Sequence, residues 1–140
     1  MFLPKNYQAS MTDIMFTTMQ EYLHKYPWEL VQTESPSVLC TVLPNRWRLN
    51  KSLPFDFRVV SLDDIPDGTM VTLKAGNDKN HCAKLRNCTS MMKNQVAKFS
   101  DLAFLERSGR GKSFSLTITI LCAPHYQIAT YNNAIQVKLD

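Results

Sequence analysis

The chain has 140 residues, of which 44% are hydrophobic and 20% charged, a composition that fits one globular domain and excludes disordered and fibrous classes. Its net charge of +4 is mild, so charge alone permits a polyanionic partner without identifying one. No apolar stretch reaches eighteen residues, and no charged leader precedes an apolar segment at the N-terminus. We therefore expect neither a membrane-spanning helix nor a secretory signal.

The first predicted element is an amphipathic helix over residues 11–26. Its apolar residues recur at three- and four-residue steps, the spacing of one helix face: Met11, Ile14, Met15, Met19, Tyr22, Leu23 and Tyr26. Pro27 should end the helix, because the residue before a proline disfavours the α region. The apolar face could bind a partner or pack on the chain's own domain, and we favour packing. The predicted organisation is a loose segment, residues 1–30, that includes this helix, followed by a domain over residues 31–140.

After residue 36 the hydrophobic period changes from that of a helix to that of strands. Strands are predicted, in chain order, at residues 38–43, 55–60, 70–73, 82–86, 96–105, 114–120 and 135–139. The strand at 96–105 is expected to have an irregular middle. The segment 114–120 (FSLTITI) is the clearest, because its even positions are apolar and its odd positions are small hydroxyl residues. Many short strands after one short helix, with no alternation of strand and helix, predict an all-β antiparallel sandwich.

Two basic segments lie beside these strands. Residues 107–113 (RSGRGKS) contain three cations and two glycines, and residues 45–51 (NRWRLNK) follow Pro44 in a predicted loop. Glycine lets the backbone approach a ligand closely, and a guanidinium group can form two hydrogen bonds to phosphate or to a guanine edge. Each segment alone could be a solvated, charged rim. Two of them favour a nucleic-acid surface if they meet at one end of the sandwich.

Other kinds of site have little support. Gly111-Lys112-Ser113 is similar to the end of a nucleotide-binding P-loop, but that motif needs a glycine where the chain has Glu106, and a helix after it. No catalytic motif is present, so we predict neither an enzyme nor a cofactor, a small-molecule substrate or a membrane partner. The cysteines have no metal-ligand or disulfide spacing and are predicted to be reduced, with no metal site: Cys40, Cys82, Cys88 and Cys122.

A series of collinear blocks is similar to one known family. The blocks include Leu43-Pro44, Trp47-Arg48, Asn50-Lys51, Leu53-Pro54, Pro66-Asp67-Gly68-Thr69, Ala75-Gly76-Asn77-Asp78, Leu85-Arg86-Asn87, Met92–Ala97, Arg107–Phe114 and Ala129-Thr130-Tyr131. Over residues 19–140 the chain thus resembles the Runt domain of core-binding-factor α-type transcription factors. The resemblance implies an immunoglobulin-like β-sandwich that acts in the nucleus and reads a duplex element similar to TGTGGT with loops at one end.

The resemblance also implies roles for individual residues. Arg48 would contact a base with Lys51 as its companion, and Arg107 and Arg110 would hold phosphate and the guanine-containing groove. The DNA-binding set it implies is Arg48, Lys51, Arg107, Arg110, Lys112, Lys138, Leu139 and Asp140, where Asp140 would orient arginines and accept from a cytosine edge. The family continues into an arginine-bearing tail beyond this point, so we expect a chain extended through that tail to bind more tightly.

A second implied contact is heterodimerisation with a β subunit that does not itself bind DNA. The residues that match the family's partner surface are Gly76, Asn77, Thr130 and Tyr131, although Gly76 and Asn77 could simply form a tight turn and Tyr131 could be a core aromatic. The chain departs from the family pattern at Leu49, Lys74, His81, Ala103 and Gln136. The alternative function is an immunoglobulin-like protein-interaction module without nucleic-acid binding. Such a module would place the two basic segments at opposite ends, and an inter-sheet disulfide would support it.

Overall fold

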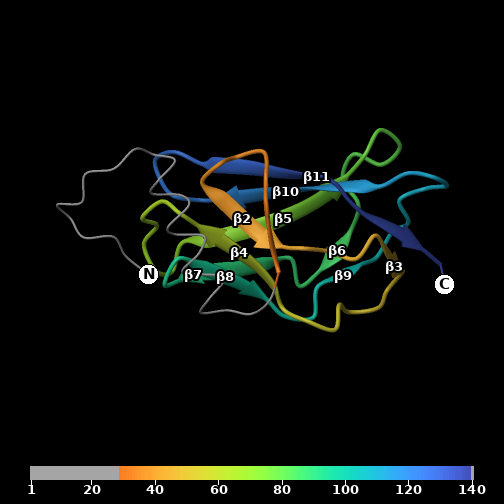
Figure 1. The fold of residues 1–140 in the computed structure, drawn as a ribbon, viewed down its shortest axis with the longest axis horizontal. Coiled ribbons are helices and arrows are strands. Elements are labelled where there is room, and N and C mark those ends of the chain that lie inside the picture. The colour runs from red at the N-terminus through yellow and green to blue at the C-terminus, as the bar shows by residue number, and fades with distance from the viewer. Residues whose placement is uncertain (1–28, 140) are drawn as a thin grey trace.

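The computed structural model describes residues 29–139, which fold entirely as strands and connecting turns (Figure 1). The helix expected at residues 11–26 and the site residue Asp140 lie outside this range. The strands are β1 (Leu30–Gln32), β2 (Val38–Thr41), β3 (Arg46–Arg48), β4 (Phe57–Ser61), β5 (Met70–Gly76), β6 (Leu85–Arg86), β7 (Thr89–Lys93), β8 (Val96–Phe99), β9 (Ala103–Phe104), β10 (Phe114–Ile120) and β11 (Gln127–Lys138). The prediction of an all-β domain is confirmed for these residues.

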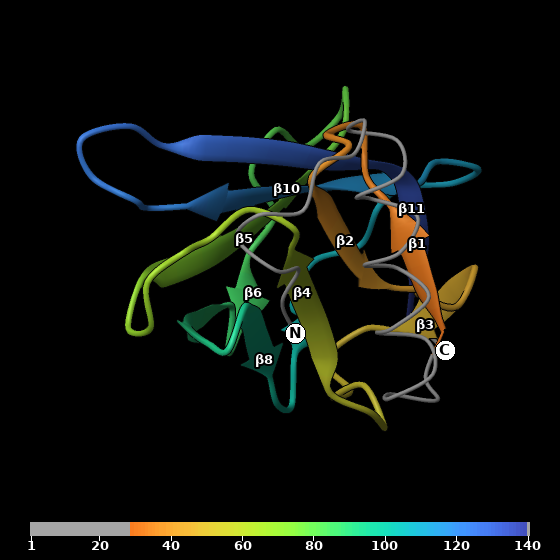
Figure 2. The ribbon, with the colours of Figure 1, turned by 60° about the vertical axis from the view of Figure 1, so that its left-hand side comes forward.

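Nine of the strands form one sheet in the order β1-β2-β4-β8-β7-β5-β10-β11-β3, and β6 pairs with β9 in a separate two-stranded sheet. The large sheet curls over itself, so that β2, β4 and β8 lie in one layer and β5, β10 and β11 in another (Figure 2). All pairs are antiparallel except β3 with β11, which is parallel. The expectation of a purely antiparallel sheet is therefore wrong at this one pair.

The main core lies between the two layers. On β10 the burial alternates strictly, with the apolar positions buried and the hydroxyl positions half-buried, as the sequence predicted. The stacked rings of Phe104 and Phe114, with centroids 6.4 Å apart, fix both ends of the loop 105–113 on this core. The largest fully buried side chains are Phe57, Phe99, Phe104, Phe114, Leu39, Met92, Leu102, Leu116, Ile118, Ile120 and Ile135.

Several strand boundaries differ from those predicted. The irregular middle expected in the strand at 96–105 divides it into two strands in different sheets, because Asp101 adopts a positive φ of 57° and interrupts the extended backbone. The strand β7 was not predicted, since only Met92 of its five residues is buried and the apolar pattern is weak. The residues of β3 fall in the segment 45–51, which the sequence predicted to be a loop. This last correction matters for function, because β3 presents two arginines.

Candidate nucleic-acid interface

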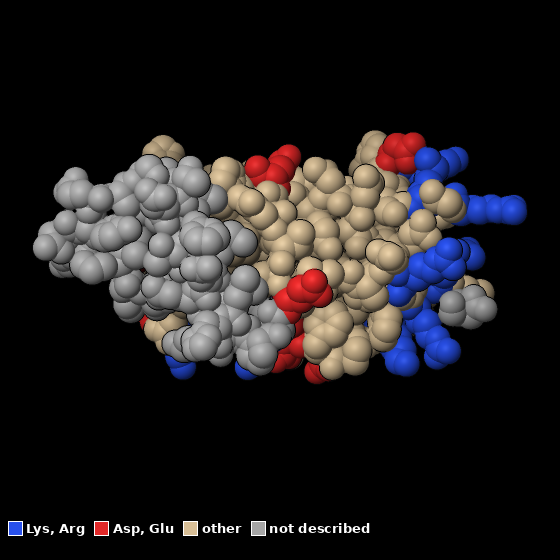
Figure 3. Space-filling model, viewed as in Figure 1, with Lys and Arg blue, Asp and Glu red and all other residues tan. Residues whose placement is uncertain are grey.

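Lysines and arginines gather at the end of the molecule where β11 ends, as the space-filling view shows (Figure 3). The parallel pairing of β3 with β11 places Arg46 beside Gln136 and Arg48 beside Lys138. Side chains alternate along a strand, so Arg46 and Arg48 both point outward while Trp47 is half-buried against the core. We call this set of cations the cationic end: Arg46, Arg48, Lys51, Arg107, Arg110 and Lys138.

The first group of these cations, on β3 and in the turn after it, surrounds a hollow of about 400 Å³. The hollow is lined by Arg46, Trp47, Arg48, Lys51 and Lys138. The Trp47 indole Nε1 donates a hydrogen bond of 2.8 Å to the carbonyl oxygen of Lys51, which closes the turn after β3. The Lys51 ammonium group lies 5.5 Å from the centroid of the Trp47 ring, within the range of a cation–π contact. Trp47 thus positions the turn and its lysine together.

The second group of cations lies on the loop 107–113, which is fixed to β11 through Ser108. This serine is buried; its amide donates to the Val137 carbonyl (3.2 Å), and its Oγ accepts from the Val137 amide (3.0 Å). Gly109 and Gly111 have positive φ values of 99° and 70°, a backbone conformation that glycine adopts without steric cost. The buried serine and the two glycines therefore hold the arginines of this loop outward.

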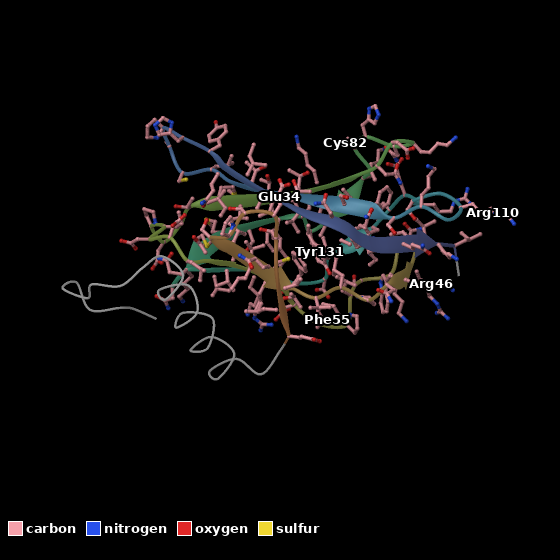
Figure 4. The ribbon with its side chains drawn as sticks, turned by 45° about the horizontal axis from the view of Figure 1, so that its top comes forward. Glu34, Arg46, Phe55, Cys82, Arg110 and Tyr131 are labelled. Atoms are coloured by element: carbon pink, nitrogen blue, oxygen red, sulfur yellow. The ribbon has the colours of Figure 1, made fainter. Side chains whose placement is uncertain are left out.

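A second hollow, of about 580 Å³, joins this loop to the end of β11. Its lining residues are Arg107, Gly109, Arg110, Val137, Lys138 and Leu139. Lys138 lines both hollows, so the segments 46–51 and 107–110 meet around it although they are far apart in sequence. Figure 4 shows Arg46 and Arg110 at the same end of the molecule. The structure thus brings together the two basic segments that the sequence analysis singled out.

Charge is largely uncompensated at the cationic end. Within residues 29–139, the structure gives no carboxylate partner to any of the six cations of the cationic end. Lys112 differs, because its Nζ lies 3.0 Å from the carboxylate of Asp78. The hydrogen bond and the charge of Lys112 lower the pKa of Asp78. Lys112 therefore fixes the loop rather than adding a free charge. A strand, β10, follows this loop where a nucleotide-binding P-loop would require a helix, which argues against nucleotide binding at Gly111-Lys112-Ser113.

The loop after β5 supports the cationic end from the side. Asn77 Nδ2 donates to the Ser108 carbonyl oxygen at 2.7 Å, and its Oδ1 accepts from the amides of Lys79 (2.9 Å) and Asn80 (2.8 Å). Glu106 accepts from the Lys84 amide (2.8 Å) and from Asn80 Nδ2 (3.0 Å). The bond from Lys84 is the main reason why the pKa of Glu106 is lowered. The loops 77–84 and 105–113 are thereby tied together.

The four predicted partner-contact residues are not equivalent in the structure. A side chain at Gly76 would collide with the His81 carbonyl oxygen, and Asn77 is engaged within its own turn and with Ser108. Tyr131 packs on the core, and its hydroxyl accepts from the Leu43 amide at 3.2 Å; burial raises its pKa. Thr130 lies on the opposite side of β11 and is half-buried. Three of the four therefore have structural roles of their own.

The outward side of β5, β10 and β11, which we call the open face, surrounds Thr130. Cross-strand pairing places Thr117 between Lys74 and Thr130, and Thr119 between Thr72 and Ile128. The next outward position on β5 is Met70, which pairs with Met91 of β7. Two of these apolar side chains are more than half exposed, Ile128 at 58% and Met91 at 57%.

Sequence reasoning missed two arginines. Arg46 belongs to the basic segment 45–51, but the sequence analysis assigns it no role in DNA binding. In a strand, its spacing of two from Arg48 places both arginines on one face. Arg86 of β6 is exposed, and its Nη2 donates to the Asn50 carbonyl oxygen at 3.1 Å. Nothing in the sequence around Arg86 signals this contact, because it joins segments 36 residues apart.

The remaining predicted absences concern metals, disulfides and membranes. All four cysteines are free, and desolvation by burial raises the pKa of Cys40 to about 12. Among residues 29–139 no cluster of His, Cys, Asp and Glu is suited to a metal ion, and no helix there has the length and apolarity to cross a bilayer. The basic segments share one end, whereas the alternative interaction module would place them at opposite ends.

Comparison with known proteins gives consistent matches. The model of the Runt domain family matches residues 19–140. The Runt-related transcription factor rnt-1 of Caenorhabditis elegans is 48% identical over 111 residues. That alignment covers 79% of this chain and 36% of the nematode protein, so the chain spans about a third of the length of this relative.

Proposed function

We propose, because this chain belongs to the Runt domain family, that it is the DNA-binding domain of a transcription regulator acting in the nucleus. In finer detail, the curled sheet is an immunoglobulin-like sandwich that grips duplex DNA with one end. The observation that supports this most directly is the meeting of the two basic segments around Lys138, with six cations that have no carboxylate partner among the described residues. Such a concentration of unpaired positive charge favours a polyanion.

Within this end, different cations would have different roles. Guanidinium groups form two hydrogen bonds to a guanine edge, the commonest specific contact in the major groove. We assign base reading to Arg48 and Arg110, and phosphate contacts to Arg46, Arg107 and Lys138. The two hollows on either side of Lys138 provide space for the backbone of one strand to pass. The preferred duplex would contain consecutive guanines, as in the TGTGGT-like element.

The other members of the implied DNA-binding set would act less directly. Lys51 is held over the Trp47 ring, so it can reach phosphate only from the turn after β3. Lys112 is paired with Asp78 and would order the loop that presents Arg110. Leu139 is 68% exposed at the end of β11 and would offer an apolar contact to sugar or to a thymine methyl group.

A binding assay tests this proposal. Fluorescence anisotropy with a TGTGGT-containing duplex and a scrambled duplex of equal length, at two salt concentrations, should show tighter binding to the first. Because each phosphate contact contributes about −0.9 to the log–log salt slope, three contacts predict a slope of at least about −2.7. Equal affinity for both duplexes at each salt concentration would contradict sequence-specific recognition, and a flat salt dependence would contradict the phosphate assignments.

We further propose that the open face binds a core-binding-factor β-type subunit. The face combines small hydroxyl side chains, at Thr117, Thr119 and Thr130, with exposed Ile128 and Met70. A surface with apolar side chains and few charges suits close packing against a protein rather than contact with phosphate. Gly76 and Asn77 would contribute by shaping the adjoining loop. A pull-down of the separate β subunit by the whole chain, with and without DNA, measures the association.

A further inference from the structure

A groove of about 360 Å³ lies beside β7, outside both the cationic end and the open face. We call it the β7 groove, and its lining includes Ser90, Met91, Lys93, Val96 and Lys98. In Figure 1, β7 and β8 lie away from the end of the molecule where β3 and the last residues of β11 meet. The β7 groove is therefore a surface separate from the one that carries the arginines of the cationic end.

The β7 groove forms because β7 passes from one layer of the sheet to the other. Its last two residues, Met92 and Lys93, pair with β8, whereas its first three residues pair with β5. The ladder between β7 and β8 thus stops at Met92. Beyond that point Ser90 Oγ donates a hydrogen bond of 2.7 Å to the Lys98 carbonyl oxygen. The groove lies where the two strands separate.

The walls of the groove combine apolar and cationic side chains. Met91 is 57% exposed, whereas the next residue, Met92, is 1% exposed and belongs to the main core. Lys93 pairs with Val96, and residues two apart in a strand share a face. Met91, Lys93, Val96 and Lys98 therefore lie on one outward surface, with two ammonium groups beside two apolar groups.

The charges of the two lysines are available to a ligand. Lys93 has no carboxylate within ion-pair distance among the described residues. Lys98 Nζ lies 4.0 Å from Asp56 Oδ2, but Asp56 is closer to Arg58 (3.6 Å) and also accepts a hydrogen bond from Ser100 (3.0 Å). An ion pair of this length at the surface is weak and is screened by salt, so Lys98 can exchange Asp56 for a carboxylate of a ligand.

The hairpin that carries Lys93 is fixed in place. Asn94 and Gln95 have positive φ values of 53° and 69°, as in the tight two-residue turns of hairpins. The side-chain amide of Gln95 bonds to both the amide and the carbonyl oxygen of Ile65, at 2.9 Å each. The Asn94 amide donates to Asp67 at 2.9 Å. The groove is therefore formed in advance, and a ligand need not spend binding energy to order it.

We propose that the β7 groove binds an acidic peptide segment of a partner protein, in which carboxylates alternate with apolar side chains. The carboxylates pair with Lys93 and Lys98, and an apolar side chain packs between Met91 and Val96. A methionine side chain adapts to apolar groups of different shape, which suits segments that become ordered on binding. Nucleic acid fits less well, because the apolar wall offers no hydrogen bond to phosphate. The site acts independently of the DNA binding proposed for the cationic end.

Fluorescence anisotropy with a short labelled peptide of alternating glutamate and leucine tests this proposal. The whole chain would carry Arg48→Glu and Arg110→Glu, so that the cationic end no longer attracts the peptide. In this background Lys93→Glu or Lys98→Glu should each weaken binding at least about threefold, because a paired charge is reversed. Lys79→Glu, at an exposed position outside the groove, changes the net charge equally and should weaken binding less than about 1.5-fold.

The apolar wall is tested in the same background. Met91→Gln should weaken binding at least about twofold, because it removes apolar contact, whereas Tyr126→Gln, at a residue 68% exposed outside the groove, should not. A peptide with serine in place of every leucine keeps its charges and should bind at least about fivefold more weakly. Equal binding of the two peptides, or no effect of Lys93→Glu, would overturn the proposal in favour of general charge attraction. Displacement of the peptide by duplex DNA would overturn it in favour of a nucleic-acid site.

Methionine methyl NMR of the unsubstituted chain gives a readout at the residue itself. The glutamate–leucine peptide should shift the Met91 methyl signal, which a Met91→Leu variant identifies. The signal of Met92, buried on the other side of β7, should move much less. A Met91 signal that stays in place at peptide concentrations that saturate the anisotropy, or the absence of any binding, would show that the groove is not the site.

Discussion

The cationic end and the open face differ in how the chain presents side chains. At the cationic end the backbone is fixed by buried anchors, such as Ser108 on β11, while the arginines extend from it without carboxylate partners in residues 29–139. On the open face the strand itself fixes the side chains, which are mostly short hydroxyls beside a few apolar groups. The first arrangement suits a long-range, salt-sensitive contact with phosphate, and the second suits a close-packed contact with protein.

The two regions are also connected through the loop 77–84. Asn77 at the end of the open face bonds to Ser108 in the arginine loop, and Asp78 pairs with Lys112 of that loop. DNA bound at the cationic end and a protein bound on the open face would therefore both act on the same set of hydrogen bonds. Variants can test whether the regions act separately, as their surfaces suggest, or together, as this connection suggests.

The largest expected effect is on DNA discrimination. Arg48→Ala or Arg110→Ala should reduce the preference for the TGTGGT-like duplex over a scrambled one by about 1–3 kcal/mol, or about 5- to 150-fold, because a two-bond contact to guanine is lost. Lys98→Ala is the matched control, since Lys98 is an exposed cation of β8 outside the cationic end. Anisotropy titrations measure both. Full discrimination by either arginine variant would refute its assigned role.

A somewhat smaller effect is expected on the open face. Thr130→Arg or Ile128→Asp should weaken binding of a β-type subunit about 5- to 30-fold, because a charge would be buried without a partner in an apolar contact. Affinity for DNA alone should change by less than about twofold, since both residues lie outside the two hollows of the cationic end. Calorimetry with each partner separately measures the two quantities. Loss of DNA binding in these variants would show that the cationic end and the open face are not separate binding surfaces.

Asn77→Ala tests the connection between them. It removes the bond to Ser108 and the two bonds within the turn, so the free energy of unfolding should fall by about 1–2 kcal/mol. Asn132→Ala, at an exposed position on β11, is the control and should have little effect. Urea unfolding and anisotropy of the same samples show whether DNA affinity falls together with stability. A stable variant with unchanged affinity would remove Asn77 from the supporting network.

How much the sequence alone could predict depended on whether a feature is local. The alternation on β10 is a local property of residues 114–120, and its burial pattern was predicted correctly. The strand β3 was not, because its three residues are held only by parallel pairing with β11, some 90 residues later in the chain. For the same reason Arg46 and the contact of Arg86 with Asn50 were missed. The meeting of the basic segments around Lys138 could be stated only as a condition, because it depends on contacts between distant parts of the chain.

The smallest expected effect concerns pH and Glu106. Hydrogen bonds from Lys84 and Asn80 hold the folded pKa of Glu106 below its ordinary value of 4.5. The stabilisation is therefore present above pH 4.5 and is lost as pH falls through the lower folded pKa. Glu106→Gln should be less stable than the parent chain at pH 7, and the difference should shrink by pH 3. The control is Glu34→Gln, at an exposed position.

Urea unfolding at the two pH values, with DNA affinity measured at pH 7, tests this prediction. Because Glu106 bonds to the loop 77–84 and precedes the arginine loop, its loss should loosen both loops at once. If Glu106→Gln lowers DNA affinity and subunit affinity in parallel, the two regions depend on one ordered connection. If it lowers stability but neither affinity, the connection is structural only. DNA binding at the cationic end and subunit binding on the open face are then energetically independent.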